Sequence, residues 1–434
     1  MMAPDAASAS PQTDPSSCPN CGTSLRCGMV GGDGSCWCFT MPHVLPVPVA
    51  ENSKNLAAKA LSSNPPDQSG CLCPACLKQL IDNQFTAMTF TLPPIESVTD
   101  VRLEAKLRHK IDHKTKPIGA LGQLEDLALQ LGLIQRSDVV TFHDPQMVVF
   151  AADHGIAAEG VSAFPQAVTL QMVTNMLAGG AAINVLARQH GFALQVVDAG
   201  VAGELAEHPQ LIKQKIGYGT QNICKAPAMS ETQLYGALQA GVDTVKALPG
   251  NVVAFGEMGI ANTSSAALLL HQLTNIPLKD VTGRGTGLTD PQLMHKRKVL
   301  MIAQLRHAHA VAPLQALATL GGFEIAMMTG AMLQAASQRR VILVDGFIAG
   351  AAALVAQALA PQVQHYMVFC HRSAERGHRL LLDHLKARPL LDLDMRLGEG
   401  SGALLAWPLV QSAARLMNEM ASFASAGISA KEGA

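Results

Sequence analysis

The feature that most restricts the fold is a regular alternation of short apolar runs with helical patterns, which begins near residue 147 and continues to residue 370. Each apolar run has the length of a strand and ends at a polar or glycine-rich turn. Strands that alternate with helices predict an α/β fold, in which helices cover both faces of a mostly parallel sheet. The expected strands are residues 147–151, 193–198, 251–255, 340–344 and 365–370.

Helical patterns follow several of these strands, at residues 169–188, 264–273 and 348–359. In a parallel sheet, ligands bind beyond the carboxyl ends of the strands, so the turns after the strands are expected to share one rim. Two other stretches look helical but do not fit the alternation, and we expect them to pack together as a small helical cap. They are residues 97–131, with a break at 116–119, and residues 404–421.

The 434 residues are 48% hydrophobic and 15% charged, enough for two or three domains with a large core. The formal net charge of −1 gives no electrostatic reason to expect a nucleic acid or an anionic membrane as partner. The first 17 residues contain no apolar segment of the kind that a secretory signal needs. Residues 341–360 approach the length of a membrane span, but Asp345 and Gly346 interrupt them, which favours a strand, a turn and a buried helix. We therefore expect a soluble, cytoplasmic protein.

The composition changes twice along the chain. Residues 1–17 are rich in Pro, Ser and Ala and are expected to form a disordered tail. Residues 18–84 hold most of the cysteines, and residues 85–434 form the long α/β unit. Within that unit, the small helical part is expected at about 92–132 and 404–430, with the α/β core between them.

Eight of the ten cysteines lie before residue 77, and they include two well-separated Cys-x-x-Cys pairs. A disulfide framework needs an oxidising compartment, whereas thiolates at this spacing are typical ligands of structural zinc. An iron–sulfur centre and unliganded or redox-active thiols are the alternatives. The other two, Cys224 and Cys370, are expected to be small buried residues. The expected metal ligands are Cys18, Cys21, Cys27, Cys36, Cys38, Cys71, Cys73 and Cys76.

A glycine-rich loop, Thr-Gly-Arg-Gly-Thr-Gly, occupies residues 282–287. Its backbone amides could surround an anion as in a phosphate nest, and an ordinary tight loop is the alternative. Lys296 follows on a predicted helix beside Arg297 and Lys298, where a solvated charged face is the simpler interpretation.

Two carboxylates lie between glycines, Glu257 directly after a predicted strand and Glu399 ahead of an uncharged stretch. A carboxylate in such a turn can face a ligand, and Asn262 or Thr263 can cap the helix that follows Glu257. If Glu399 faces a poorly solvated pocket, desolvation raises its pKa and suits it to accept a proton. A purely structural turn for Glu257 and a helix N-terminal acid for Glu399 are the alternatives.

Two further polar residues invite a catalytic interpretation that we do not favour. His154, in the turn Asp153-His154-Gly155, is better interpreted as a turn histidine whose hydrogen bonds are satisfied, and Glu324 as a favourable charge in the first turn of a helix. The chain also lacks a nucleophile elbow, a Walker P-loop and a G-x-G-x-x-G fingerprint on its first strand.

Taken together in their order, the motifs resemble those of the nicotinate-nucleotide–dimethylbenzimidazole phosphoribosyltransferases of cobalamin lower-loop assembly. The resemblance covers about residues 92–430, and seven motifs in order are highly specific although each is weak alone. The cysteine-rich segment lies outside it and is similar to the small Cys-Trp-Cys proteins of bacteria. The matching segments are 114–125, 153–155, 256–260, 283–287, 345–347, 371–375 and 396–400.

The resemblance implies a Rossmann-like large domain, a small helical domain and a homodimer. It implies transfer of a phosphoribosyl group from nicotinate mononucleotide to a benzimidazole base, with Glu399 as the base that receives the proton. Glu257 and Lys296 match functionally important acidic and basic positions. Catalysis would need no metal or other cofactor. The residues that match the benzimidazole pocket are Gln171, Met258 and Leu397, and those that match the mononucleotide site are Gly285, Thr286, Asp345, Gly346 and Ser373.

The chain departs from the family pattern at Ile118 and Ala120, where the family usually has proline and serine, and at Ala163, where some relatives have serine. These changes concern base selectivity more than chemistry. Two other functions remain open: a nucleotide-binding oxidoreductase, which bound dinucleotide would support, and a non-catalytic cobamide-pathway sensor or scaffold, which turnover would exclude.

Overall fold

The computed structural model describes residues 23–24, 90–285 and 287–429. The chain divides into two compact units, Met1–Met88 and Thr89–Ala434, and the fold below is that of the second unit. The expected tail, the eight clustered cysteines and Thr286 lie outside the described residues.

Six parallel strands form the sheet in the order β3-β2-β1-β4-β5-β6. The five expected strands are confirmed within a few residues at their ends. The sixth, β3, was not expected, because a three-residue, partly exposed edge strand leaves no pattern in the sequence. The strands are β1 (Gln146–Ala152), β2 (Ala193–Gly200), β3 (Leu211–Lys213), β4 (Val252–Met258), β5 (Val341–Val344) and β6 (Met367–Phe369).

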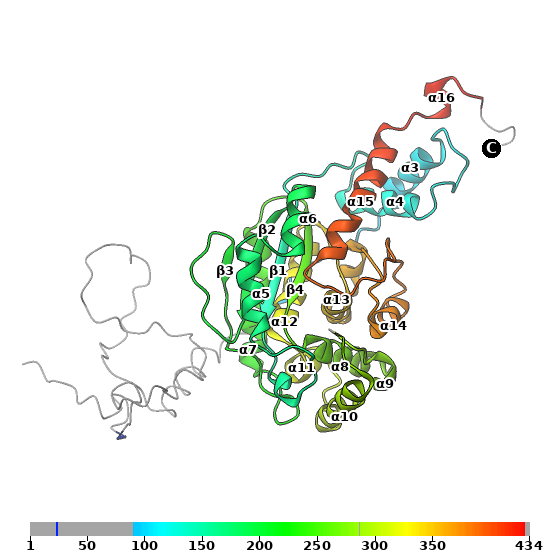
Figure 1. Cartoon of the computed structure of the whole chain (residues 1–434). Helices are drawn as coiled ribbons and strands as arrows, with labels where there is room; N and C mark the ends of the chain where they lie inside the picture. The colour runs from blue at the N-terminus through cyan, green and yellow to red at the C-terminus, as the bar shows by residue number, and fades with distance from the viewer. Residues whose placement is uncertain (1–22, 25–89, 286, 430–434) are drawn as a thin grey trace, which may run out of the picture. The chain divides into compact units, whose positions relative to one another are not determined.

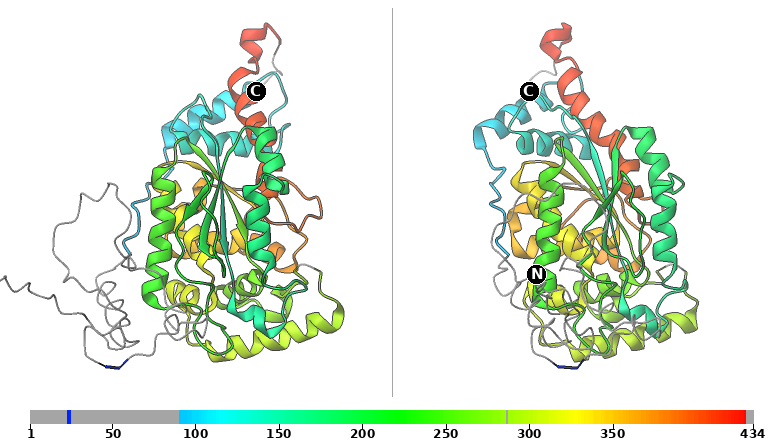
Figure 2. Two further views of the ribbon diagram at one scale, coloured as in Figure 1. Left: turned by 60° about the vertical axis from the view of Figure 1, so that its left-hand side comes forward. Right: turned by 90° about the vertical axis from the view of Figure 1, so that its left-hand side faces the viewer.

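Helices cover both faces of the sheet (Figures 1 and 2). Two are short 3₁₀ helices, η2 (Gly155–Glu159) and η3 (Pro361–Tyr366). The α-helices are α3 (Val101–Asp112), α4 (Gln123–Gln135), α5 (Val168–Leu177), α6 (Ala182–His190), α7 (Glu231–Ala247), α8 (Asn262–Thr274), α9 (Leu278–Val281), α10 (Asp290–Arg306), α11 (Pro313–Leu320), α12 (Phe323–Ser337), α13 (Phe347–Leu359), α14 (Arg376–His384), α15 (Ser401–Glu419) and α16 (Phe423–Ala426).

One helix expectation was wrong. The stretch 169–188 is not continuous but forms α5 and α6, because the chain turns at Gly179, whose φ of +82° lies in the left-handed region. By length and composition alone, Val168–His190 is the one stretch of the described residues apolar enough to cross a membrane, and this turn divides it. The expected strand, turn and buried helix at 341–360 are confirmed as β5 and α13.

The strand order places a topological switch point at β1, which pairs with β2 on one side and β4 on the other. From this point the connections run in opposite directions, so a crevice opens beyond the carboxyl ends of these strands. The buried helix α12 packs against β1, β2, β4 and β5 and forms the centre of the core with α7 and α13.

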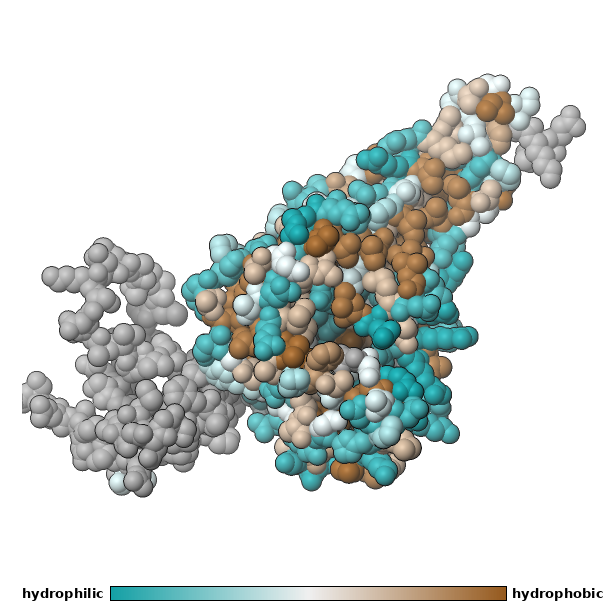
Figure 3. Space-filling view, viewed as in Figure 1, coloured by the Kyte–Doolittle hydropathy of each residue, from teal (hydrophilic) through white to brown (hydrophobic). Residues whose placement is uncertain are grey.

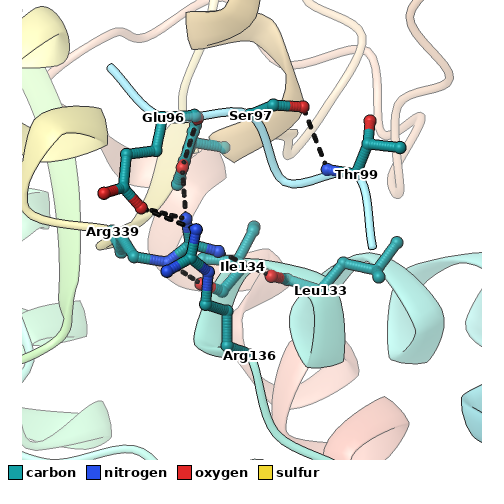
Figure 4. A network of polar contacts seen from close by, with 8 residues as sticks. Glu96, Ser97, Thr99, Leu133, Ile134, Arg136 and Arg339 are labelled. Carbon is teal, nitrogen blue, oxygen red and sulfur yellow. Dashed lines mark hydrogen bonds and ion pairs between the residues drawn. The ribbon is translucent and has the colours of Figure 1, made fainter. Parts of the chain in front are cut away.

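The cap expected from the sequence is present: α3 packs on α4, and α4 packs on the long C-terminal helix α15 (Figure 1). The guanidinium of Arg339, which follows α12, joins the core to the cap. It donates to the carbonyl of Ile134 in α4 over 3.0 Å and contacts the carboxylate of Glu96, before α3, over 3.4 Å (Figure 4). The Lys114 ammonium donates to the Met420 carbonyl over 2.5 Å, which joins the α3–α4 loop to the end of α15.

Candidate active site

A cavity of about 330 Å³ lies at the rim that the sequence predicts, beyond the carboxyl ends of β4, β5 and β6. Its walls differ in character: the side formed by α5 is apolar, whereas the side formed by the turns after the strands carries carboxylates and backbone amides. On the face drawn in Figure 3, apolar side chains gather over α6 and α15, beside this region. The apolar wall includes Phe164, Val168, Met172, Met258, Ile260 and Leu397.

Glu399 lines the cavity at the start of α15 and is 4% exposed. It has a φ of +63° between Gly398 at +84° and Gly400 at +92°, a run of left-handed residues that costs about 1–3 kcal/mol at the one non-glycine position. Such strain persists only where the surroundings fix the conformation. The carboxylate accepts a hydrogen bond of 3.1 Å from the Ile183 amide, in the first turn of α6, so it faces a second helix N-terminus.

The pKa of Glu399 is raised from its usual value, chiefly because burial disfavours the charged form. The Ile183 amide opposes this rise, and the nearby Asp345 carboxylate adds to it. The side chain therefore lies between two influences, desolvation that favours the acid and a helix N-terminus that favours the anion. A group in this setting can exchange a proton with a bound ligand.

Through its carboxylate, Asp345 fixes the turn formed by residues 398–400, which carries Glu399. Its two carboxylate oxygens accept hydrogen bonds of 3.2 Å from the Gly400 amide and 3.1 Å from the Ala403 amide, so Asp345 caps α15 from another element. The His371 Nε2 atom lies 3.5 Å from the same carboxylate. Asp345 lines the cavity, but its oxygens are already engaged in holding the turn that carries Glu399.

Glu257 lies near the carboxyl end of β4, and burial raises its pKa to about 8. Its Oε2 atom accepts a hydrogen bond of 2.5 Å from the Asn262 amide, which lowers the pKa, whereas the carboxylates of Asp345 and Glu399 raise it. The expected capping role of Asn262 is wrong, because α8 begins after Ala261 and the Asn262 side chain holds Glu257 instead. At neutral pH Glu257 is mainly protonated.

Lys296 is 1% exposed on α10, so a solvated charged face is the wrong interpretation for this residue. Its ammonium donates a hydrogen bond of 2.8 Å to the Thr263 hydroxyl, and Thr263 itself lines the cavity. Burial lowers the pKa of Lys296 to about 8, while the Glu375 carboxylate raises it. Lys296 thus lies one side chain behind the cavity wall and reaches it through Thr263.

The N-terminus of α13 opens into the cavity. Gly346 is the N-cap residue and has no side chain to satisfy the first amides of the helix, and Phe347, Ile348 and Ala349 also line the cavity. Ser373 lies beside it, and its backbone amide donates to His378 Nδ1 over 2.9 Å. Unpaired amides at the start of a helix are a general anion-binding arrangement.

The structure brings most of the predicted site residues together and leaves others aside. Gln171 is exposed on α5 and does not line the cavity, although its neighbours Val168 and Met172 do. The departures at Ile118, Ala120 and Ala163 are exposed and also lie outside the lining. The predicted residues that line the cavity are Glu257, Met258, Gly285, Asp345, Gly346, Ser373, Leu397 and Glu399.

Several lining residues carried no predicted role. Glu375 and His371 belong to a motif that the sequence singles out, but a single carboxylate or imidazole there has no spacing that marks it as a ligand contact. Arg396 is exposed at the glycine turn and also lines the cavity. Phe164 and Met172 could not be distinguished from ordinary apolar helix or loop residues.

The turn after β1 is buried, and both ring nitrogens of its histidine have a partner within the protein. His154 Nε2 lies 2.7 Å from the Glu324 carboxylate, and His154 Nδ1 lies 3.1 Å from the Ser265 hydroxyl. Neither His154 nor Glu324 lines the cavity. The interpretation of His154 as a satisfied turn histidine is therefore supported, and Glu324 makes a specific buried contact in addition to its place in the first turn of α12. Cys370 is buried as expected, and Cys224 is partly buried.

Comparison with known proteins agrees with this arrangement. The phosphoribosyltransferase family model matches residues 97–428, and the cysteine-rich CWC family model matches residues 18–78. The nicotinate-nucleotide–dimethylbenzimidazole phosphoribosyltransferase of Variovorax paradoxus is 55% identical over 342 residues, which cover 79% of this chain and 98% of that protein. The protein of the same name from Cupriavidus taiwanensis is 58% identical over 341 residues, covering 78% and 97%.

A crystal structure of the enzyme with this name from Thermus thermophilus superposes with a TM-score of 0.73 at 41% identity, and it covers 77% of this chain and 100% of that chain. The match thus extends over the sheet, the cavity and the cap. The resemblance drawn from the seven motifs is confirmed: the chain belongs to the family of nicotinate-nucleotide–dimethylbenzimidazole phosphoribosyltransferases.

Proposed function

We propose that this chain transfers the 5-phosphoribosyl group of nicotinate mononucleotide to 5,6-dimethylbenzimidazole, giving α-ribazole 5′-phosphate and nicotinate for assembly of the cobalamin nucleotide loop. The observation that carries the proposal is Glu399, a buried carboxylate in a strained turn, which lines a cavity whose apolar wall suits a flat heterocycle.

The chemistry needs few protein groups. The nicotinate leaves from a positively charged ring nitrogen, so its departure requires no general acid. The incoming benzimidazole nitrogen attacks the anomeric carbon in line as the bond to nicotinate breaks, which inverts that carbon and gives an α-riboside. The protein must therefore position the two substrates and remove one proton. No step requires a metal or another cofactor.

We propose that Glu399 accepts the proton that the benzimidazole loses. As the new bond forms, the second ring nitrogen of the benzimidazole becomes strongly acidic, and a carboxylate nearby can accept its proton. Glu257 is less suited to this role, because burial raises its pKa to about 8 and it already holds a proton at neutral pH. A protonated Glu257 can instead donate a hydrogen bond to a ligand.

The N-terminus of α13 supports the assignment of the mononucleotide phosphate. Gly346, Ser373 and Gly285 all line the cavity, where backbone amides and a hydroxyl can donate to phosphate oxygens. Lys296 adds a buried positive charge behind Thr263. The benzimidazole would then lie against Met258 and Leu397, on the apolar side.

The experiment that tests the proposed function is a turnover assay with nicotinate mononucleotide and a panel of benzimidazoles, with products identified by mass and by the configuration at the anomeric carbon. We expect the α-riboside phosphate and free nicotinate in equal amounts. Absence of turnover with every base would contradict the proposal, and a β-riboside product would contradict the in-line mechanism.

We further propose that the enzyme is a cytoplasmic homodimer and that its cysteine-rich segment binds structural zinc. One face of α10 exposes Met294, Met301, Ile302 and Leu305 by 52–68%, and the opposite face is buried, so this helix offers an apolar surface to a second copy. For zinc, the support is the donor set, eight thiols that include two Cys-x-x-Cys pairs.

A further inference from the structure

One carboxylate in the cavity wall has no role in the mechanism given above. Glu375 lines the cavity, is 7% exposed, and precedes α14 as its N-cap residue. Its Oε2 atom is buried and makes no hydrogen bond within the described residues. A buried carboxylate oxygen without a donor is costly, so a donor that a ligand brings to the adjoining cavity would stabilise Glu375 once its carboxylate turns toward it.

The surroundings hold this carboxylate in place. A β-carbon at Gly283 would collide with the Glu375 Oε2 atom, so the glycine leaves room for the carboxylate. Burial raises the pKa of Glu375, whereas the Lys296 ammonium, the Gly285 amide and the Arg396 guanidinium lower it. The two cations favour the ionised carboxylate, but burial is the larger influence and the pKa of Glu375 stays above its usual value.

The substrate limits what Glu375 can bind. Nicotinate mononucleotide carries a phosphate, a ring carboxylate and a cationic ring nitrogen, none of which donates a hydrogen bond when ionised. Its donors are the two hydroxyl groups of the ribose. The N–H of the benzimidazole is the remaining donor in the reaction, and its proton goes to Glu399.

We infer that Glu375 binds the ribose of the nucleotide by accepting a hydrogen bond from its 2′- or 3′-hydroxyl group. This inference rests on the proposed function and extends it to the sugar. In the mononucleotide the ribose carries the phosphate, and Glu375 adjoins two residues that we assign to that phosphate: its amide donates to the Ser373 hydroxyl over 3.3 Å, and the Gly285 amide acts on its carboxylate. A negative charge beside the ribose also favours the positive charge that develops on the sugar as nicotinate leaves.

The test compares nicotinate mononucleotide with its 2′-deoxy and 3′-deoxy analogues, in wild-type enzyme and in Glu375→Ala. The readout is the ratio of kcat/KM for the ribonucleotide to kcat/KM for each analogue. For the wild type we expect roughly 10-fold or more discrimination against one analogue, because a hydrogen bond to a charged acceptor is lost. In Glu375→Ala this discrimination should fall to near 1.

Two further variants make the outcome decisive. Glu375→Gln keeps the shape of the side chain and one acceptor, so it should retain part of the discrimination, and it replaces Glu375→Ala if that variant does not fold. Glu399→Gln is the matched control, because it should slow all three nucleotides equally and leave the ratio unchanged. Discrimination that is absent in the wild type, or that persists undiminished without the Glu375 carboxylate, would overturn the inference. Failure of the wild type with nicotinate mononucleotide itself would instead contradict the proposed function.

Discussion

In the proposed mechanism, Glu399 is the residue on which the chemistry depends most directly. Replacing it by Gln keeps its size and a hydrogen bond to Ile183 but removes the proton acceptor. We expect kcat to fall by roughly 10²-fold or more with little change in substrate binding, since general-base catalysis is worth about that much. Steady-state kinetics with both substrates measures it. Because burial raises the pKa of Glu399, the wild-type enzyme should also lose activity on the acid side, at a pH above the usual carboxyl range.

Glu257→Gln is the control for this assignment, because the two carboxylates interact and could share one proton. The assignment of Glu399 as the base is wrong if Glu399→Gln keeps near-normal kcat while Glu257→Gln is inactive.

Glu257 also gives a pH dependence of stability. Its pKa is raised from 4.5 to about 8, so between these values the folded protein holds a proton that the unfolded chain has lost. Stability from this group is therefore complete below pH 4.5 and is lost as the pH rises to about 8. Relative to Glu257→Gln, the wild type should lose up to about 1.4 kcal/mol of unfolding free energy per pH unit in this window. Urea unfolding of both proteins at pH 5, 6.5 and 8 measures it, and a constant difference would contradict the expectation.

For single residues, the sequence predicts which side chains could take part in chemistry better than it predicts whether each one is buried or lines the cavity. Glu257 and Glu399 stand out in the sequence because each is a carboxylate in a glycine-containing turn, where it can face a ligand. Lys296 looked like part of a charged helix face, because nothing in the sequence shows that α10 turns this position into the core. The role of Glu375 could not be predicted either, because it is inferred from a buried carboxylate oxygen without a hydrogen-bond donor, which the sequence does not show.

Among the elements, the glycine-rich loop before α10 allows a test of the proposed phosphate site. Gly285 has a φ of +55°, and a β-carbon there would lie 3.1 Å from the Thr263 hydroxyl and 3.6 Å from the Lys296 ammonium. We expect Gly285→Val to raise KM for the nucleotide while base affinity stays nearly unchanged. Gly191→Val is the matched control, with a φ of +71° and no neighbouring atom within 4 Å of the added β-carbon. If Gly285→Val weakens base binding equally, the loop is only structural.

The exposed face of α10 makes a separate prediction about assembly. Met301→Lys combined with Leu305→Lys should convert the proposed dimer to a monomer, because both residues are more than half exposed and point away from the buried face. Sedimentation velocity measures the change. A matched variant, Leu393→Lys, removes an equally exposed apolar residue elsewhere and should leave the assembly intact. A dimer that survives the double substitution places the interface on another surface.

The elements themselves could largely be predicted from the sequence. Runs of Val, Ile, Leu and Phe identified five strands because strands buried on both faces are continuously apolar. The edge strand β3 and the division between α5 and α6 could not be predicted, because the first is too short to show a period and the second depends on a backbone conformation at Gly179.

For the whole molecule, the division at residue 88 predicts that the two units are separable. A truncated chain that begins at Phe85 should keep transferase activity within a few-fold, because every residue of the cavity lies beyond it. The full-length protein should contain one or two Zn²⁺ by elemental analysis, and the truncated chain none. A full-length protein free of metal contradicts the zinc proposal, and an inactive truncated chain contradicts the independence of the two units.

Helix α15 has a consequence that reaches across the molecule. Its first residues follow Glu399 in the cavity wall, and its other end is fixed in the cap through Met420 and the α3–α4 loop. A helix of 19 residues spans about 28 Å, and this one contains Pro408, which removes one hydrogen bond from its interior. Because α15 joins the cap to the turn that carries Glu399, we expect a substitution in the cap to affect that turn. The position of the carboxylate that we propose as the base should then depend on parts of the chain that touch neither substrate.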